Sequence, residues 1–290
     1  MRHPSLLGLL LCTVAFTSTA FAATCDVDIP RQPRETFDKA AFHLWLPDDV
    51  PAGPVRGIAI VLDGINVDGR PQWQNFARDH QLALVACYFA TEDLTDFFHY
   101  TKADRGSGRA LLNALAALGQ QSGHPEFEKV PLFVMGLSAG GEFSYNFACF
   151  CPERVAAFVS NKGGGFIIPP TDAVRAIPGL FIAGAKDQRY RAASRKFYEP
   201  NRKLGARWCL AIESKCGHNT ANANDLALPF FAAVLASFDR PAAERTGIVL
   251  DLDQKKLIAP GIPPATASLT FWFPDQSLIA VWNTFLNNPH

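Results

Sequence analysis

The chain of 290 residues has no excess charge, because its 27 Lys and Arg residues are balanced by 27 Asp and Glu residues. Proteins that bind nucleic acids usually carry a basic surplus, so the sequence predicts no nucleic acid partner. The chain also has no C-x-x-C pair, which is the usual sign of a zinc ribbon or a thioredoxin-like centre. A hydrophobic fraction of 48% is sufficient for the core of one large domain, and no internal repeat divides the chain.

The N-terminal apolar segment is too short for a membrane anchor. It covers Leu6–Phe16, whereas a membrane-spanning helix needs about 20 residues. The basic residues of Met1–His3 precede it and the small-residue sequence Ala20-Phe21-Ala22 follows it, which is the order of a cleavable signal peptide. We predict a signal peptide over residues 1–22 and a secreted or periplasmic protein.

The cysteines fit this localisation. Without Cys12, which leaves with the signal peptide, an even number remains, and an even number in an exported chain favours disulfides. A bridge between Cys209 and Cys216 would stiffen the segment around His218. The alternative is that several of these cysteines are buried thiols. The remaining cysteines are Cys25, Cys87, Cys149, Cys151, Cys209 and Cys216.

The motif with the clearest chemistry is Gly136-Leu137-Ser138-Ala139-Gly140. It follows the apolar run 130–135 and precedes residues 141–151, which have the pattern of a helix. A serine at a sharp strand-to-helix turn has a strained backbone, and its hydroxyl projects above the edge of the sheet. The flanking glycines let the strand and the helix approach closely. We therefore predict that Ser138 is a nucleophile.

A nucleophilic serine needs a general base. Only His218 and His290 follow Ser138 in the chain. A histidine at the chain terminus is a poor base, because chain ends are seldom held in one position. His218 follows the strand-like run 207–212, so it is the predicted base.

The acid that orients this base is predicted to be Asp187. It follows the buried-type strand 179–184, and hydrolases with this serine motif place the acid between serine and histidine in the chain. Two alternatives remain open. Glu213 directly follows the next strand but is close in sequence to His218, and Asp172 lies in a proline-rich loop with no strand before it.

The oxyanion of the reaction needs preorganised hydrogen-bond donors. One predicted donor is the amide of Ala139, the residue after the nucleophile. The second comes from the loop after the strand 57–62. This loop begins Asp63-Gly64-Ile65-Asn66.

On these motifs, residues 40–240 resemble the α/β-hydrolase superfamily, in which this loop normally reads His-Gly-x. The resemblance makes the amide of Ile65 the second donor, with Gly64 as the alternative, while Asp63 replaces the usual histidine. It also implies one α/β-hydrolase domain over residues 23–240, with a mostly parallel central sheet and helices on both faces. Residues 241–290, which are rich in proline and then in aromatic residues, are expected to pack on this domain as an appendage.

A narrower resemblance is to secreted esterases of the polyhydroxybutyrate-depolymerase, feruloyl-esterase and acetylxylan-esterase type. It rests on residues 105–109, 136–141 and 161–164 and on Phe271-Trp272-Phe273-Pro274-Asp275. It implies hydrolysis of a small or polymer-linked ester by a serine mechanism, for which no cofactor is needed. A serine peptidase of related fold and a catalytically silent binding protein are the alternatives.

Two further groups of residues bear on the substrate. The aromatic stretch 88–100 and the turn 161–166 follow strands, and loops at strand ends form the pocket in such sheets. The basic residues between Lys186 and Lys203 are interpreted as a solvated helix face rather than a site for acidic substrates. Asp63, Asn66 and Asp68 lack the ligand set of an EF-hand loop, so no metal site is predicted.

Overall fold

A computed structural model describes residues 23–47, 54–62, 67–93, 96, 98–251, 256–258 and 270–287. The predicted signal peptide lies outside the described residues, as do Asp63–Asn66, Phe97 and His290. In the part of the chain that is described, none of the helices has the length and apolar character needed to cross a membrane.

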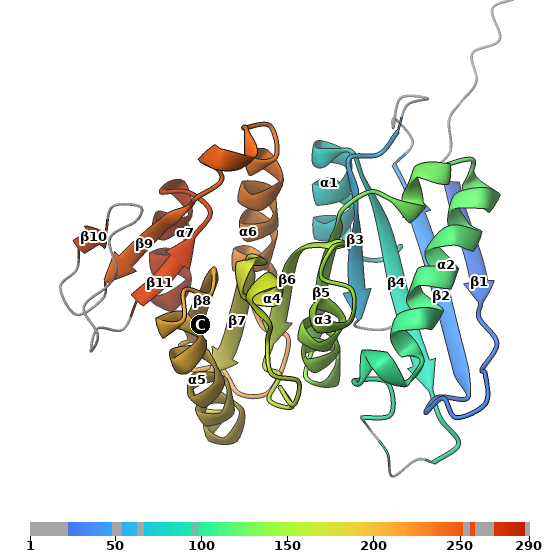
Figure 1. Ribbon diagram of the computed structural model, residues 1–290, viewed down its shortest axis with the longest axis horizontal. Helices are drawn as coiled ribbons and strands as arrows, with labels where there is room; N and C mark the ends of the chain where they lie inside the picture. Colours follow the sequence, from blue (N-terminus) through green and yellow to red (C-terminus); the bar gives the residue numbers. More distant parts are fainter. Residues whose placement is uncertain are drawn as a thin grey trace, which may run out of the picture.

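The centre of the fold is an eight-stranded sheet with the strand order β1-β2-β4-β3-β5-β6-β7-β8 (Figure 1). The pairs β1–β2 and β2–β4 are antiparallel, and every other pair in this sheet is parallel. The expectation of a mostly parallel sheet is therefore confirmed. The strands are β1 Ala23–Asp28, β2 Lys39–Leu46, β3 Gly57–Leu62, β4 Leu82–Ala90, β5 Leu132–Leu137, β6 Val155–Asn161, β7 Gly179–Gly184 and β8 Trp208–Glu213.

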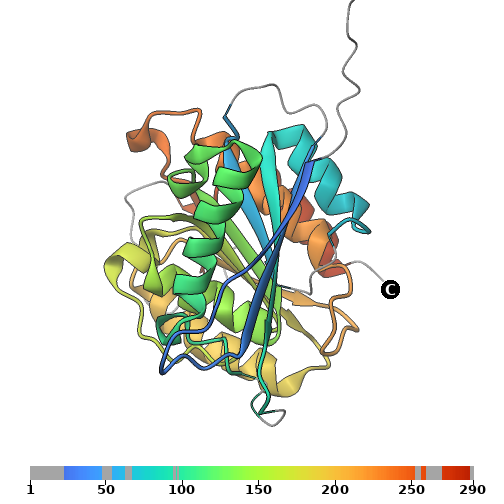
Figure 2. The same cartoon turned by 90° about the vertical axis from the view of Figure 1, so that its right-hand side faces the viewer.

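Helices cover both faces of this sheet, as predicted. With the sheet seen nearly edge-on, α2 lies on one side and α1 and α6 on the other (Figure 2). Ring contacts join helices of the same layer: Trp73 of α1 meets Phe231 of α6, and Tyr145 of α3 meets Phe197 of α5. The helices are α1 Pro71–His80, α2 Ser107–Ser122, α3 Ala139–Phe150, α4 Asp172–Ala176, α5 Gln188–Lys203, α6 Ala223–Ser237 and α7 Ser277–Asn287, with short 3-10 helices at η1 Ala103–Arg105, η2 Pro125–Glu128 and η3 Ala242–Glu244.

The central strands are buried on both faces, which explains their continuous apolar sequences. Every residue of β3 and β7 is buried, and so are Leu111, Leu115 and Leu118 of α2, which face the sheet. Because β5 to β8 run parallel, their carboxyl ends meet at one edge of the sheet. Polar residues that follow these strands are brought together there.

Residues after α6 form a second, small sheet with the order β10-β9-β11, followed by α7. Its strands are β9 Ile248–Asp251, β10 Lys256–Ile258 and β11 Thr270–Phe273. This part packs beside β8, the last strand of the main sheet, where the Trp282 indole donates to the Leu210 carbonyl at 3.2 Å. On the same strand, the Tyr198 hydroxyl donates to the Trp208 carbonyl at 3.1 Å. Phe271, Trp272, Phe273 and Trp282 are all buried, so this aromatic cluster is packing.

Candidate active site

Ser138 stands at the turn between β5 and α3, as the sequence motif predicts. It is the N-cap of α3, and its backbone has φ 55° and ψ −116°, a region that residues with a Cβ seldom adopt. The flanking glycines are required by close packing. A Cβ on Gly136 would lie 2.5 Å from the carbonyl carbon of Gly140, and a Cβ on Gly140 would lie 2.5 Å from the Leu62 oxygen.

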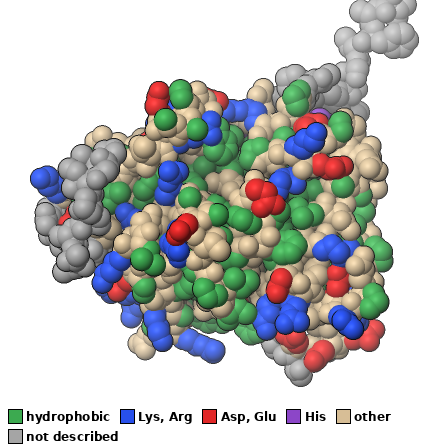
Figure 3. Space-filling view, viewed as in Figure 1, with side chains coloured by type: hydrophobic (Ala, Val, Ile, Leu, Met, Phe, Trp, Pro, Cys, Tyr) green, Lys and Arg blue, Asp and Glu red, His purple; other side chains and the backbone are tan. Residues whose placement is uncertain are grey.

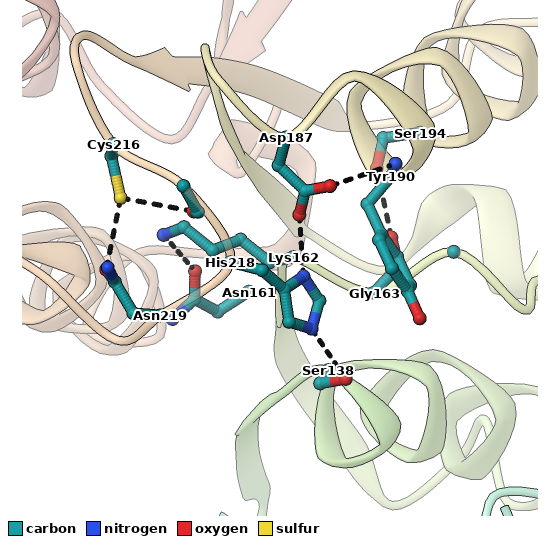
Figure 4. Close-up of polar contacts among 12 residues, drawn as sticks. Ser138, Asn161, Lys162, Gly163, Asp187, Tyr190, Ser194, Cys216, His218 and Asn219 are labelled. Carbon is teal, nitrogen blue, oxygen red and sulfur yellow. Dashed lines mark hydrogen bonds and ion pairs between the residues drawn. The ribbon is translucent and has the colours of Figure 1, made fainter.

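The structure brings Ser138, His218 and Asp187 into one hydrogen-bonded row (Figure 4). His218 Nδ1 lies 2.6 Å from Asp187 Oδ2, and His218 Nε2 lies 2.8 Å from Ser138 Oγ. A carboxylate only accepts hydrogen bonds, so Nδ1 carries the proton and donates to Asp187. Nε2 is then left as an acceptor for the serine hydroxyl, which is the arrangement that a general base requires.

Asp187 is held from two sides. Its Oδ2 accepts from His218, while its Oδ1 accepts from the Tyr190 amide at 3.4 Å and caps α5. The Asp187 side chain is 8% exposed and that of His218 is 34% exposed. The carboxylate is therefore shielded from water, whereas the imidazole remains accessible. The Tyr190 ring packs on His218 with its centroid 4.3 Å away, a contact that no sequence motif indicated.

Glu142 is a buried carboxyl close to this row. Its Oε1 accepts from the amides of Gly165 at 2.6 Å and Gly164 at 3.2 Å, so it fixes the loop after β6. Burial raises the pKa of Glu142 more than these two amides lower it. Glu142 also lies in the first turn of α3, where the helix dipole favours a negative charge.

A cavity of 280 Å³ is lined in part by Tyr190, whose ring packs on His218, whereas Ser138, His218 and Asp187 do not line it. One part of its wall is apolar or aromatic, and Phe98 and Ile167 are among the exposed large hydrophobic residues of the protein. Two cations, Lys102 and Arg189, also line it. The lining residues are Phe98, Thr101, Lys102, Glu142, Gly164, Gly165, Ile167, Arg189, Tyr190 and Ala193.

No family model matches the sequence, and no curated protein matches it. Solved structures do. A poly(3-hydroxybutyrate) depolymerase from Bordetella parapertussis has a TM-score of 0.55 at 18% identity, covering 77% of this chain and 93% of its own. A ferulic acid esterase has a TM-score of 0.57 at 11% identity, covering 74% and 98%. A dienelactone hydrolase from Anabaena variabilis has a TM-score of 0.53 at 20% identity, covering 73% and 97%. The chain has the α/β-hydrolase fold.

Within this α/β-hydrolase fold, the two alternative acids have other partners. Glu213 forms a buried ion pair with Lys162, with its Oε2 2.8 Å from Nζ. Asp172 begins α4, pairs with Arg175 and has a side chain that is 97% exposed. Neither of them is the residue that contacts His218 Nδ1.

Of the two predicted oxyanion donors, Ala139 lies among the described residues. Ala139 is the first residue of α3, so its amide has no acceptor within the helix. Ile65 and the alternative donor Gly64 lie outside the described residues. Leu62, the last residue of β3, contacts Gly140, so the loop that carries Ile65 starts beside the turn of Ser138.

The predicted disulfides are not formed in the structure. The six cysteines that it describes are free, including Cys209 and Cys216. Cys209 lies near the start of β8, and the strand from Cys209 to Glu213 spans about 13 Å at about 3.3 Å per residue. Cys216 stays beyond that end, because its carbonyl accepts from the Lys186 amide past the end of β7. A disulfide needs Cα atoms within about 7 Å. Cys216 instead donates to the Asn219 side chain at 3.2 Å.

The two segments expected to contact substrate, residues 88–100 and 161–166, contribute some side chains to the core and others to the cavity. Phe98 lines the cavity, whereas Phe89 stacks on Tyr100 in the core with ring centroids 5.3 Å apart. Phe166 packs on Phe197 and Phe181. The basic residues of α5 gather on the surface as expected (Figure 3), except for Arg202, which is buried and donates to the Ala206 carbonyl.

A buried histidine on β2 gives a pH-dependent stability. His43 Nδ1 lies 2.8 Å from Asp26, and Nε2 lies 3.0 Å from Asp68, just after the loop of Ile65. Burial would lower the pKa of His43, but the two carboxylates outweigh it and the pKa is raised. A raised pKa means stability that is present below the unfolded pKa of about 6.5 and is lost as pH rises through the folded pKa.

We therefore expect His43→Gln to destabilise the protein by about 1 kcal/mol more at about pH 5.5 than at about pH 8.5, a modest value because both carboxylates are largely exposed. Urea unfolding at the two pH values measures the difference. His80 is the control, because burial lowers its pKa, so His80→Gln should instead relieve a loss of stability at acidic pH. An equal effect of His43→Gln at both pH values would contradict the assignment.

Proposed function

We propose that the protein is a serine hydrolase that cleaves carboxylic esters through an acyl-enzyme. The observation that supports this most directly is the row Ser138–His218–Asp187 at a strained strand-to-helix turn, with contacts of 2.8 and 2.6 Å. These distances are those of a nucleophile, its base and the acid that orients the base. The fold is shared with esterases and a depolymerase, which agrees with this chemistry.

In the proposed reaction, Ser138 Oγ attacks the ester carbonyl carbon and its proton moves to His218 Nε2. Asp187 stabilises the imidazolium that forms and keeps Nδ1 protonated. The alcohol leaves with the proton from Nε2, and the acyl group stays on Ser138. Water then attacks the acyl-enzyme, giving its proton to Nε2, and the carboxylic acid is released as Ser138 is reprotonated.

The oxyanion of both steps would be held by the amides of Ala139 and Ile65. Two features support this. The Ala139 amide stands at the N-terminus of α3, where the helix dipole favours negative charge. The strand β3 ends beside Gly140, so the loop that follows it starts at the same place.

The cavity that Tyr190 lines supports a proposal for the substrate. Its volume of 280 Å³ suits a small acyl or alcohol group, and Phe98, Ile167 and Tyr190 offer apolar contact. The ester can be free or part of a polymer. No cofactor enters the mechanism, and export of the protein with removal of residues 1–22 remains part of the proposal.

The test is hydrolysis of p-nitrophenyl esters from acetate to octanoate by the wild type and by Ser138→Ala. We expect turnover with an optimum among the shorter chains, and loss of turnover in the variant. Labelling by a fluorophosphonate provides a second readout, because only an activated serine reacts with it. The protein should be labelled at Ser138 and should remain unlabelled after the substitution.

Turnover and labelling of the same two proteins also distinguish an esterase from a serine peptidase and from a catalytically silent binding protein. A serine peptidase would turn over p-nitroanilide peptides faster than the esters, although Ser138 would still be labelled. A catalytically silent binding protein would give neither turnover nor labelling while it remained folded. Either outcome would replace the esterase proposal.

A further inference from the structure

A buried ion pair lies directly behind the candidate active site. Lys162 follows β6 with a fully buried side chain, and Glu213 ends β8 with a side chain that is 5% exposed. Lys162 Nζ donates to Glu213 Oε2 at 2.8 Å and to Asn161 Oδ1 at 3.0 Å. Replacing such a pair with apolar residues is often neutral for stability, so the pair needs another explanation.

Glu213 joins the two ends of the loop that carries His218. It stands where the loop leaves β8, and its Oε1 accepts from the backbone and side-chain nitrogens of Asn222 at 3.0 and 3.3 Å. Asn222 is the N-cap of α6, where the loop ends. His218 lies in the middle of this loop, so one carboxylate fixes both of its ends.

Lys162 connects this loop to the turn of the nucleophile. Its neighbour Asn161 accepts from the Ser138 amide at 2.8 Å through its backbone oxygen. The Asn161 side chain accepts from the Lys162 ammonium group (Figure 4). Glu213 accepts from the same ammonium group. Lys162 has φ 53°, and its amide donates to the Ile182 carbonyl of β7 at 2.6 Å. The Lys162 backbone is thus held in an unfavourable conformation. Its ammonium links the end of β6, through Asn161, to the end of β8, through Glu213.

We propose that Lys162 and Glu213 are positioning residues that set the distance between His218 Nε2 and Ser138 Oγ. The proposal rests on the proposed function of the Ser138 row. An ion pair at this depth is screened much less by salt than an exposed one, so its hold on the loop depends little on ionic strength. A displacement of about 1 Å at the reacting atoms can lower a rate by about 100-fold.

The test replaces the pair by K162M/E213L, which leaves no unpaired charge in the core. We expect cooperative unfolding to persist, kcat for the best p-nitrophenyl ester to fall by about 10- to 100-fold and KM to change by less than about threefold. The NMR resonance of the His218 Nδ1 proton should broaden or disappear. A merely structural role would change the melting temperature and leave this resonance and kcat intact.

A second variant, K162M/E213Q, keeps an oxygen for Asn222 and removes only the link to β6. It should fold and recover part of the lost kcat. If K162M/E213L does not unfold cooperatively, K162M/E213Q alone tests the proposal. The His218 Nδ1 proton resonance of this variant is again expected to broaden or disappear. The matched control is R195M/E199Q, which removes an exposed ion pair from α5, and it should leave kcat and the resonance unchanged.

Wild-type kcat together with a sharp His218 resonance in the paired variants would overturn the proposal. Failure of the proposed function looks different. The wild type would then show no Ser138-dependent turnover, and the resonance would still report whether the pair positions His218.

Discussion

Replacing Ser138 with glycine should abolish ester hydrolysis and at the same time raise the melting temperature above that of the Ser138→Ala variant. Ser138 has φ 55° and ψ −116°, a conformation that costs a residue with a Cβ about 1–3 kcal/mol. Glycine adopts it freely but loses more entropy on folding, by about 0.4–1 kcal/mol. The net gain over alanine is about 1 kcal/mol, or roughly 2–4 °C in a protein of this size.

Both variants lack the nucleophile, so both should lose at least about 10⁴-fold in kcat/KM. Calorimetry on wild type, Ser138→Ala and Ser138→Gly separates the two effects, because alanine removes the hydroxyl and keeps the Cβ. Equal melting temperatures for alanine and glycine would mean that the turn carries no strain. Residual activity in both would mean that Ser138 is not the nucleophile.

Asp187→Asn should lower kcat by about 10³- to 10⁴-fold while the protein remains as stable as the wild type. An asparagine cannot accept from His218 Nδ1 and stabilise the imidazolium as a carboxylate does, and its amide group favours the wrong tautomer of the base. The helix cap is kept, because asparagine caps as well as aspartate does and Oδ1 can still accept from the Tyr190 amide. Steady-state kinetics with circular dichroism melting tests both statements.

The control for this substitution is Asp172→Asn. Asp172 was one of the two alternative acids, and it lies on α4 with its side chain in solvent. This variant should keep wild-type kcat. The assignment of the acid would be wrong if Asp172→Asn lost activity and Asp187→Asn did not.

Much of the central fold could be predicted because its signals are local. The apolar run Gly179–Gly184 was predicted as a strand and has those bounds, and so does the predicted strand Gly57–Leu62. The placement of Ser138, Asp187 and His218 followed from residue types at strand ends. Parallel strands bring such ends together, and the structure places the three side chains in contact.

The parts that were missed depend on contacts between distant residues. Lys162 lies in a glycine-rich turn that suggests solvent, and its partner Glu213 is 51 residues away. The cysteine pattern favoured a bridge that the length of β8 prevents. The strand β1 was not predicted. It is a short edge strand in which half-buried and exposed residues alternate, so it lacks the apolar run that marks β3 or β7.

The side chains that cover β8 determine how a chain without its last residues would behave. The Trp208 and Leu210 carbonyls accept from Tyr198 and Trp282, and residues 270–287 come after all the strands of the main sheet in the chain. Tyr198 of α5 precedes β8 in the chain, so without residues 270–287 the Leu210 carbonyl and the flank of β8 beside β11 are the part left uncovered, a backbone edge of the kind that recruits other strands. A chain truncated before Trp282 would thus carry every strand of the main sheet and be prone to self-association through that edge.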